Sequence, residues 1–307
     1  GMQNSRFPMY IAITQNVVNI IASLGLVYLC GMKVEGVALG TLIAQYAGFL
    51  MGIVLWMHNY GRLKRFWEIK NYKLNIKGRE GAGIWEKEAM FRFFQVPRDI
   101  FLRTLCLVAV TLFFTSAGAS QGEIILAVNT LLMQLFTLFS YVMDGFAYAG
   151  EALSGRYIGA RNREAFTDTV RHLFGWGAVI AVLFTLVYAL GGNAFLGLLT
   201  DDKEVIAVAD TYFYWALAVP AVGIAAFIWD GIFIGATATR GMLLSMAAAA
   251  VSFFILYYGL HPVLANHALW LAFLTYLLMR GVVQTGLSRE VIRRAFPSKK
   301  EPAWHEG

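Results

Sequence analysis

Residues 124–150 read IILAVNTLLMQLFTLFSYVMDGFAYAG, a run that is apolar apart from one carboxylate and a few hydroxyl and amide groups. As a helix rising 1.5 Å per residue, the run is long enough to cross the roughly 30 Å hydrocarbon core of a bilayer. It does not match a membrane β-strand, because such strands alternate polar and apolar residues in segments of about 10 residues. The stretch therefore predicts a transmembrane helix.

Runs of the same kind occur along the whole chain. The candidate spans are 8–31, 36–58, 99–118, 124–150, 173–199, 205–234, 241–260 and 268–288. The 307 residues are 58% hydrophobic and only 14% charged, with a mean hydropathy of +0.60, values that soluble domains rarely reach. We therefore predict an all-α polytopic membrane protein with eight transmembrane helices, whose first partner is the lipid bilayer.

Lysine and arginine are distributed unevenly between the two sides of these spans. Of the 25 Lys and Arg residues, only Lys33 and Lys203 fall in the connections 32–35, 119–123, 200–204 and 261–267. The opposite side is therefore predicted to be cytoplasmic, with both observed ends of the chain on it, in the inner (plasma) membrane. The net charge of +6 is explained by this topology and by contact with anionic lipid, and so it does not indicate nucleic-acid binding.

One long polar connection, 59–98, separates the first two spans from the other six. Its mixture of basic and aromatic residues fits an amphipathic stretch on the inner leaflet. We expect four parts: 1–58 as the last two helices of a first lobe, 59–98 as a cytoplasmic linker, 99–288 as a second lobe of six helices, and 289–307 as a disordered cytoplasmic tail.

The first two spans also repeat the last two. Gly1 and Arg6 align with Gly235 and Arg240 in a register that needs no gap, and the span boundaries agree in the same register. Parallel repeats of this kind occur in transporters. Complete duplication requires four further spans ahead of Gly1, and we therefore expect the sequence to be a fragment.

Polar side chains follow one face of the predicted helix 124–150. Successive polar residues are spaced alternately four and three apart, which places them on a single face: Thr130, Gln134, Thr137, Tyr141, Asp144, Tyr148 and Glu151. A carboxylate near the bilayer centre costs roughly 2.5–3.5 kcal/mol, so it faces a cavity or a partner. Gln134, Tyr141, Asp144 and Tyr148 are therefore candidate cavity-lining residues. A buried hydrogen-bonded stripe that holds helices together is the alternative.

Three further charged residues in or beside the spans are candidates for a functional role. Asp230 is flanked by apolar residues and is a candidate for binding a proton or substrate, or else it pairs locally, for example with Arg240. Asp99 and Arg103 are four residues apart, a spacing that predicts an ion pair on one helix face at the cytoplasmic edge. Alternatively, Arg103 is a switchable counter-ion for a carboxylate such as Asp144.

Sequence signals for catalysis are missing. The five histidines lie at span ends or in the tail, and no Cys/His spacing typical of a zinc site occurs. There is no phosphate-binding loop ending in Gly-Lys-Ser/Thr and no catalytic constellation. We expect a protein that is not an enzyme and needs no metal or cofactor.

Three segments carry a resemblance to a known family: GMQNSRFPM (1–9), DGFAYAGEALSGRYIGARNR (144–163) and WDGIFIGATATRGML (229–243). They resemble the multidrug and toxic compound extrusion (MATE) family, nearest to its DinF-like bacterial branch, and the likeness runs over nearly the whole chain. The resemblance implies a twelve-helix antiporter of two six-helix lobes, of which this chain holds the last two helices of the first lobe and all of the second. Such proteins export organic cations or other amphipathic compounds, driven by inward movement of protons or sodium.

The resemblance also bears on the first span, where Asn16, Asn19 and Ser23 share one helix face. In several relatives an asparagine is followed four residues later by an aspartate in the cation site of the first lobe. Asn19 fits the first position, and Asn16 is a candidate beside it. Ser23 departs from the second position, so the missing carboxylate argues against coupling through this helix.

The leading hypothesis is therefore a secondary antiporter, in which protonation of Asp144 first and Asp230 second competes with a cationic substrate for one cavity. A lipid-linked sugar flippase of the same superfamily is an alternative, although its pyrophosphate cargo calls for several basic residues and only Arg103 and Arg280 lie near spans. A second alternative is a membrane protein that binds a ligand without transporting it. The sequence leaves open the substrate and the choice between proton and sodium.

Overall fold

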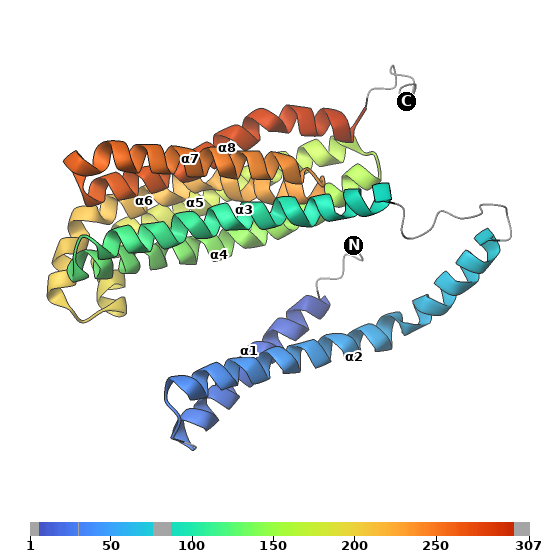
Figure 1. Ribbon diagram of the computed structural model, residues 1–307, viewed down its shortest axis with the longest axis horizontal. Coiled ribbons are helices and arrows are strands. Elements are labelled where there is room, and N and C mark those ends of the chain that lie inside the picture. Colours follow the sequence, from blue (N-terminus) through green and yellow to red (C-terminus); the bar gives the residue numbers. More distant parts are fainter. Residues whose placement is uncertain (1–5, 30, 76–86, 298–307) are drawn as a thin grey trace. The chain divides into compact units, whose positions relative to one another are not determined.

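The computed structural model describes residues 6–29, 31–75 and 87–297. They form helices α1 (Arg6–Tyr28), α2 (Val34–Asn75), α3 (Lys87–Ala119), α4 (Glu123–Gly159), α5 (Arg163–Leu199), α6 (Lys203–Gly235), α7 (Thr239–Leu264) and α8 (Asn266–Ala295), as Figure 1 shows. All 8 contain a stretch long and apolar enough to cross a membrane. Within the described ranges no strand occurs, so the prediction of an all-helical polytopic membrane protein with eight spans is confirmed there.

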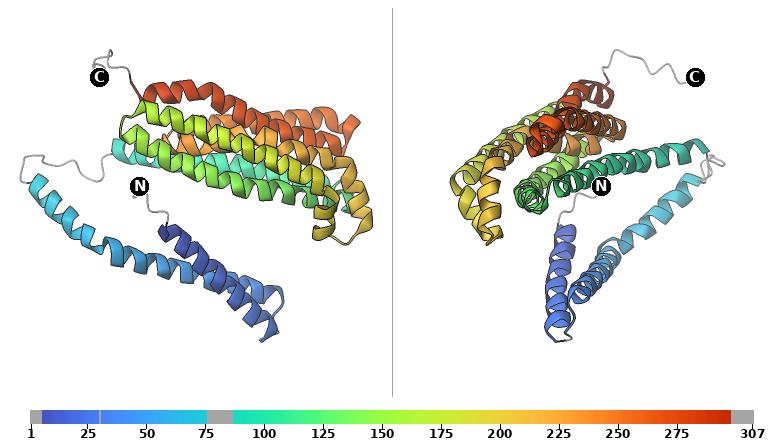
Figure 2. Two further views of the ribbon diagram at one scale, coloured as in Figure 1. Left: turned by 180° about the vertical axis from the view of Figure 1, so that it is seen from behind. Right: turned by 60° about the vertical axis from the view of Figure 1, so that its left-hand side comes forward.

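The helices divide into two compact units, Gly1–Glu86 with α1 and α2, and Lys87–Gly307 with α3 to α8. In the first unit α1 and α2 pack as a hairpin. In the second, α3 to α8 lie side by side as one bundle (Figure 2). Arg6 and Arg240, which the internal repeat aligns, lie at the starts of α1 and α7. Two helices are thus followed by six, as the apolar runs indicate.

The helices extend beyond the predicted spans. Because α2 continues to Asn75 and α3 begins at Lys87, much of the expected linker 59–98 is helical. The expected disordered tail from 289 likewise begins as helix, since α8 continues to Ala295. The physical reason is that an apolar run marks the crossing of the hydrocarbon, whereas a helix can continue into water beyond it. Residues 76–86 and 298–307 of these two segments lie outside the described residues.

Two connections in the second unit are tight turns of the same design. Helix α4 ends at Gly159 and α6 at Gly235, and two residues further on Arg161 and Thr237 have φ values of 53° and 54°. Asn162 then caps α5, with its side-chain oxygen accepting a backbone N–H of the first turn at 3.0 Å. Such turns satisfy the terminal backbone groups within a few residues and join successive spans directly.

Helix α6 is the central element of the second unit and packs against α4, α5 and α8. Two glycines four residues apart let it approach α4 closely. A Cβ atom at Gly231 would overlap the carbonyl oxygen of Ala147, and one at Gly235 would overlap the hydroxyl of Ser154. Small residues at this spacing are typical of closely packed membrane helices. The contact places Asp230, the residue before Gly231, beside α4.

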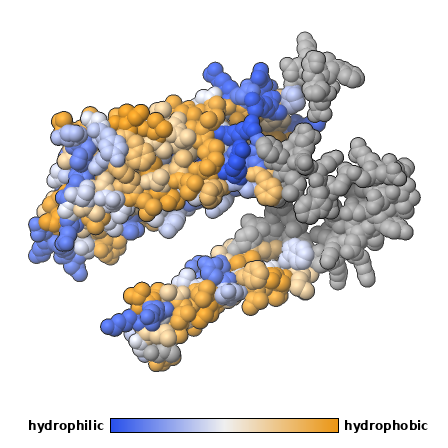
Figure 3. Space-filling view, viewed as in Figure 1, coloured by the Kyte–Doolittle hydropathy of each residue, from blue (hydrophilic) through white to orange (hydrophobic). Residues whose placement is uncertain are grey.

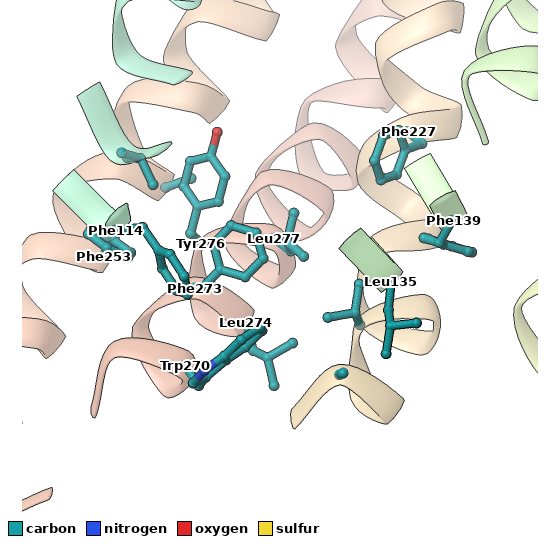
Figure 4. Packing of buried hydrophobic residues seen from close by; sticks show 14 of the residues in the cluster. Phe114, Leu135, Phe139, Phe227, Phe253, Trp270, Phe273, Leu274, Tyr276 and Leu277 are labelled. Atoms are coloured by element: carbon teal, nitrogen blue, oxygen red, sulfur yellow. The ribbon is translucent and has the colours of Figure 1, made fainter. Parts of the chain in front are cut away.

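Aromatic and aliphatic side chains fill the rest of this bundle. Figure 4 shows Phe114, Trp270 and Phe273 packed together, with ring centroids of Phe114 and Trp270 5.3 Å apart. On the outside, a broad apolar band lies between polar ends of the six-helix unit (Figure 3). An apolar exterior around a well-packed interior is the arrangement expected for helices surrounded by lipid.

Candidate functional site

The carboxylate of Asp230 on α6 is the centre of a buried polar cluster. Arg280 of α8 donates through Nη2 to Oδ2 at 2.5 Å, and Gln284 of α8 donates through Nε2 to Oδ1 at 2.6 Å. Arg103 of α3 donates through Nη2 to the same Oδ2 atom. One carboxylate therefore joins α3, α6 and α8.

The cluster is withdrawn from the surface of the six-helix unit. Asp230 is 7% exposed, Arg280 5% and Gln284 0%. Arg280 also lies over the rings of Phe227 and Tyr276, at 5.7 and 6.0 Å from their centroids, in cation–π geometry. The Nε atoms of both arginines and Oε1 of Gln284 are buried without a hydrogen-bond partner among the described residues. The cluster thus has donors that Asp230 does not use.

These residues line a cavity of about 460 Å³ between α3, α4, α6 and α8. Its charged lining residues are Arg103, Asp144, Glu151, Asp230 and Arg280. Carboxylates and guanidinium groups at membrane depth normally face such cavities and mark a substrate or ion path. The cavity is therefore the candidate functional site.

Asp144 of α4 differs from Asp230 although both line this cavity. It is half-buried, and no hydrogen bond from a described residue reaches its carboxylate. Its charge interacts with those of Arg280, Asp230 and Arg103. The cavity thus combines a carboxylate saturated by three donors with a second one that is free to bind a proton or a cation.

A profile of the MatE family matches residues 100–260, more than half of the chain. The chain belongs to the MatE family. The match confirms the resemblance to MATE proteins and the multi-pass membrane character of the chain.

Several relatives are similar over most of this MatE chain. DNA damage-inducible protein F of Escherichia coli is 37% identical over 282 residues, which are 92% of this chain and 59% of that protein. Protein DETOXIFICATION 42 of Arabidopsis thaliana is 20% identical over 286 residues, 92% of this chain and 52% of that protein. This chain therefore spans between half and three-fifths of the length of these two relatives.

Solved MATE structures share the fold. A point-substituted form of the Vibrio cholerae MATE transporter VcmN matches with a TM-score of 0.78 and 14% identity, covering 95% of this chain and 63% of that one. A MATE protein in a bent conformation matches with a TM-score of 0.74 and 16% identity, covering 94% and 62%. At these identities the likeness establishes the fold, not the cargo.

The structure contradicts the expected ion pair between Asp99 and Arg103. Asp99 is 1% exposed and accepts hydrogen bonds from Arg98 Nη2 at 3.0 Å and from Thr239 Oγ1 at 3.2 Å. Arg103 pairs instead with Asp230. The spacing of four allows the predicted pair, but neighbouring helices offer both residues other partners. Asp99 anchors α3 to the start of α7 and does not line the cavity.

The suggested local pairing of Asp230 with Arg240 is also wrong. Arg240 is exposed at the start of α7, whereas both guanidinium groups on Asp230 come from α3 and α8. Arg103, considered as a switchable counter-ion for a carboxylate such as Asp144, contacts the carboxylate of Asp230 in this structure. A carboxylate at membrane depth pairs with guanidinium groups of the helices that surround it, and these helices can be distant in the sequence.

The polar stripe of α4 divides between two cavities. Asp144, Tyr148 and Glu151 line the central cavity. Gln134 lines another of about 630 Å³ at the far end of α4 with Thr130, Glu123 and Asp202. Tyr141 lines neither and is 70% exposed. The structure thus brings Asp144 and Tyr148 together with Asp230 and Arg103, and it separates Gln134 and Tyr141 from them.

The candidates of the first unit form a polar seam between α1 and α2. Asn19 donates through Nδ2 to Thr41 Oγ1 at 3.4 Å and accepts a hydrogen bond from Ser23 at 3.0 Å. Asn16 is exposed. In this unit the asparagine at position 19 therefore contributes to helix pairing.

Sequence reasoning missed two members of the cluster, Arg280 and Gln284. A signal for them was present, because Arg280 is a charged residue inside the apolar run 268–288 and Gln284 follows it by one helical turn.

For metal binding, the described residues contain no group of three or more His, Cys, Asp or Glu side chains that could hold an ion.

Proposed function

We propose that this MatE chain belongs to a secondary antiporter that exports organic cations or other amphipathic compounds in exchange for protons or sodium. Membership in the family and the fold shared with solved MATE transporters support membrane transport. The observation that carries the proposal further is Asp144, an unpartnered carboxylate in a cavity that already contains a neutralised one. Such a group can bind a proton or a cationic cargo.

Charge balance in the cavity supports competition between the two. Arg103 and Arg280 carry two positive charges, and Asp230 and an ionised Asp144 carry two negative ones. One proton or one monovalent cation adds a single positive charge to this set, whereas binding both at once adds two where the dielectric is low. Glu151, two helical turns further along α4, adds the same negative charge to the cavity whether one cation or two are bound. It therefore leaves the difference in net charge between these two states unchanged. Exclusive binding of one or the other is the property that antiport requires.

The driving force follows from the same balance. Moving one charge across 100 mV is worth roughly 2.3 kcal/mol. Export of one monovalent cation for one proton moves no net charge, so this exchange would draw on the pH difference alone. Sodium in the place of the proton would draw on the sodium gradient. Flux driven by an imposed pH gradient without sodium, or by a sodium gradient at equal pH, separates the two ions.

A sugar flippase receives less support from the cavity. A diphosphate cargo carries several negative charges and needs an excess of guanidinium charge in the cavity, where Asp144, Glu151 and Asp230 oppose the two arginines. In this structure Arg103 and Arg280 both donate to one oxygen of Asp230. Their pairing with a resident carboxylate therefore favours the antiporter.

For the orientation, we propose an inner-membrane protein with the ends of this chain in the cytoplasm, because lysine and arginine are concentrated on that side of the spans. The exposed residues Ser120 and Asn162 lie in the turns at opposite ends of α4. Single cysteines at these positions, in a background without Cys30 and Cys106, test it. An impermeant thiol reagent applied to intact cells should label Ser120→Cys and leave Asn162→Cys unlabelled, and the reverse pattern would refute the orientation.

The decisive experiment is Asp144→Asn in the full-length protein reconstituted into sealed vesicles. We expect loss of ion-linked efflux of an organic cation, because the variant lacks the carboxylate for which cargo and ion compete. Asp168→Asn is the matched control, since it makes the same change at an exposed position on α5 outside this cavity. Efflux that is unchanged in Asp144→Asn would remove this residue from the mechanism.

A further inference from the structure

The hydrogen bonds on Asp230 are redundant. Arg103 and Arg280 donate to the same atom, Oδ2, while Gln284 donates to Oδ1. If Arg103 withdrew, Asp230 would retain a buried guanidinium and an amide. The side chain of Arg280 is 6% exposed, whereas that of Arg103 is 19% exposed. Of the two arginines, Arg103 is therefore the one that can leave at lower cost.

Arg103 also has a second carboxylate within the same cavity. A guanidinium carries five N–H donors, and Arg103 uses one Nη2 atom on Asp230 while its buried Nε has no partner among the described residues. Asp144 lines the cavity too, interacts electrostatically with Arg103, and accepts no hydrogen bond from a described residue. An unused donor and an unused acceptor of opposite charge thus share one space of about 460 Å³.

From these contacts we infer that Arg103 is a tethered counter-ion shared by Asp230 and Asp144. When Asp144 is ionised and empty, it attracts Arg103. When Asp144 binds a proton or a cationic cargo, Arg103 pairs with Asp230 alone, as in this structure. The inference rests on the proposed antiport and deepens it, because it makes Arg103 a positioning residue that competes with proton and cargo for the same carboxylate.

The other ionisable groups around Asp144 are less suited to this exchange. Asp230 on α6 is held by three donors, and Arg280 on α8 is fixed between that carboxylate and the rings of Phe227 and Tyr276. Tyr148 and Glu151 lie on α4, as Asp144 does, so a contact between them and Asp144 would not connect α4 to another helix. The cavity lining includes no residue of α5.

The position of Arg103 on α3 gives the exchange a mechanical consequence. Helix α3 packs mainly against α7, and Asp99 anchors it there through Thr239. Pro97, which has no N–H, removes one backbone hydrogen bond from the first half of α3. The bond from Arg103 to Asp230 ties this helix to α6. Transfer of Arg103 to Asp144 would release α3 from α6 and tie it to α4.

The native cysteine at position 106 offers a reporter, because it lies one turn after Arg103 on α3 and is partly buried against the core. In a Cys30→Ser background, the rate of maleimide modification of Cys106 is measured in the full-length protein between pH 5.5 and 8. Each rate is divided by that of the same protein unfolded in detergent, since the thiolate fraction itself rises with pH. We expect the normalised rate to change severalfold with pH in the parent.

Variants of this reporter protein test the role of Arg103. Arg103→Gln and Asp144→Asn should each abolish the pH response, and combining them should add nothing further. Arg103→Lys retains the charge and should retain a response. Arg171→Gln, the same change at an exposed position on α5, should leave it intact. A full pH response in Arg103→Gln would overturn the inference, as would a folded Arg103→Lys protein with none.

Transport measured on the same variants distinguishes this inference from the antiport on which it rests. A Cys106 response that depends on Arg103, in a parent without ion-linked efflux, would refute antiport and support the counter-ion exchange. Ion-linked efflux with the same pH profile in the parent and in Arg103→Gln, together with unchanged labelling, would refute the exchange and leave antiport standing. Arg103→Gln should fold, because Asp230 keeps Arg280 and Gln284 as hydrogen-bond donors. If size-exclusion chromatography shows that Arg103→Gln aggregates, Arg103→Lys is measured in its place.

Discussion

Replacement of Asp230 by asparagine tests whether the buried cluster is an energetic unit. The change preserves the shape of the side chain and removes its charge, which leaves the guanidinium of Arg280 at 5% exposure without a counter-ion. The amide keeps one acceptor oxygen, and its new NH2 group would face the N–H donors of either Arg280 or Gln284. Breaking a buried pair by removing one partner costs about 3–5 kcal/mol. At about 1.4 kcal/mol per tenfold, the unfolding equilibrium should shift by about 100-fold or more.

The same chemical change at Asp144 is the matched comparison. Asp144 accepts no hydrogen bond from a described residue, so Asp144→Asn should alter the free energy of unfolding by about 1 kcal/mol or less. Both variants can be titrated to equilibrium in mixed micelles with a denaturing detergent, with the 8 tryptophans as the fluorescence signal. The double variant Asp230→Leu/Arg280→Met removes both buried charges and should recover part of the loss.

The reasoning fails if Asp230→Asn and Asp144→Asn shift the unfolding equilibrium equally. It also fails if the double variant is no more stable than Asp230→Asn alone. In either case Asp230 would not be the saturated carboxylate of the pair, and the assignment of proton or cargo binding to Asp144 would lose its basis.

Two further changes test the framework that holds the site. Gly231→Ala should destabilise the protein by about 1–3 kcal/mol, because its Cβ would overlap a backbone carbonyl of α4. Gly145→Ala is the control and should alter stability far less, since no atom lies within 4 Å of the new Cβ. The two variants are compared by their melting temperatures in detergent. Asn129→Leu should cost about 1–3 kcal/mol, because it removes a reciprocal amide pair with Asn266 at 2.8 and 3.0 Å. Thr130→Val is its control, since that hydroxyl bonds only within α4; equal losses in these two would contradict the assignment.

The sequence determined the helical membrane architecture. An apolar run longer than the hydrocarbon thickness and a polar stripe at helical spacing are local properties, which do not depend on what the helix packs against. For that reason the eight spans were predictable, and so was the placement of Asp144 on one polar face of α4. The ends of α2, α3 and α8 were not, because hydropathy records the lipid boundary and not the end of the hydrogen-bonded helix.

Only the tertiary structure decided the partners of the charged residues. The neighbours of Asp230 on its own helix face are apolar, and the two guanidinium groups that bind it are 127 and 50 residues away in the chain. Spacing along α3 favoured a pair between Asp99 and Arg103 that does not form. Which charges meet depends on which helices approach closely, and here that depends on contacts such as Gly231 against α4. A buried ion pair follows from helix packing, and packing is a property of the assembled bundle.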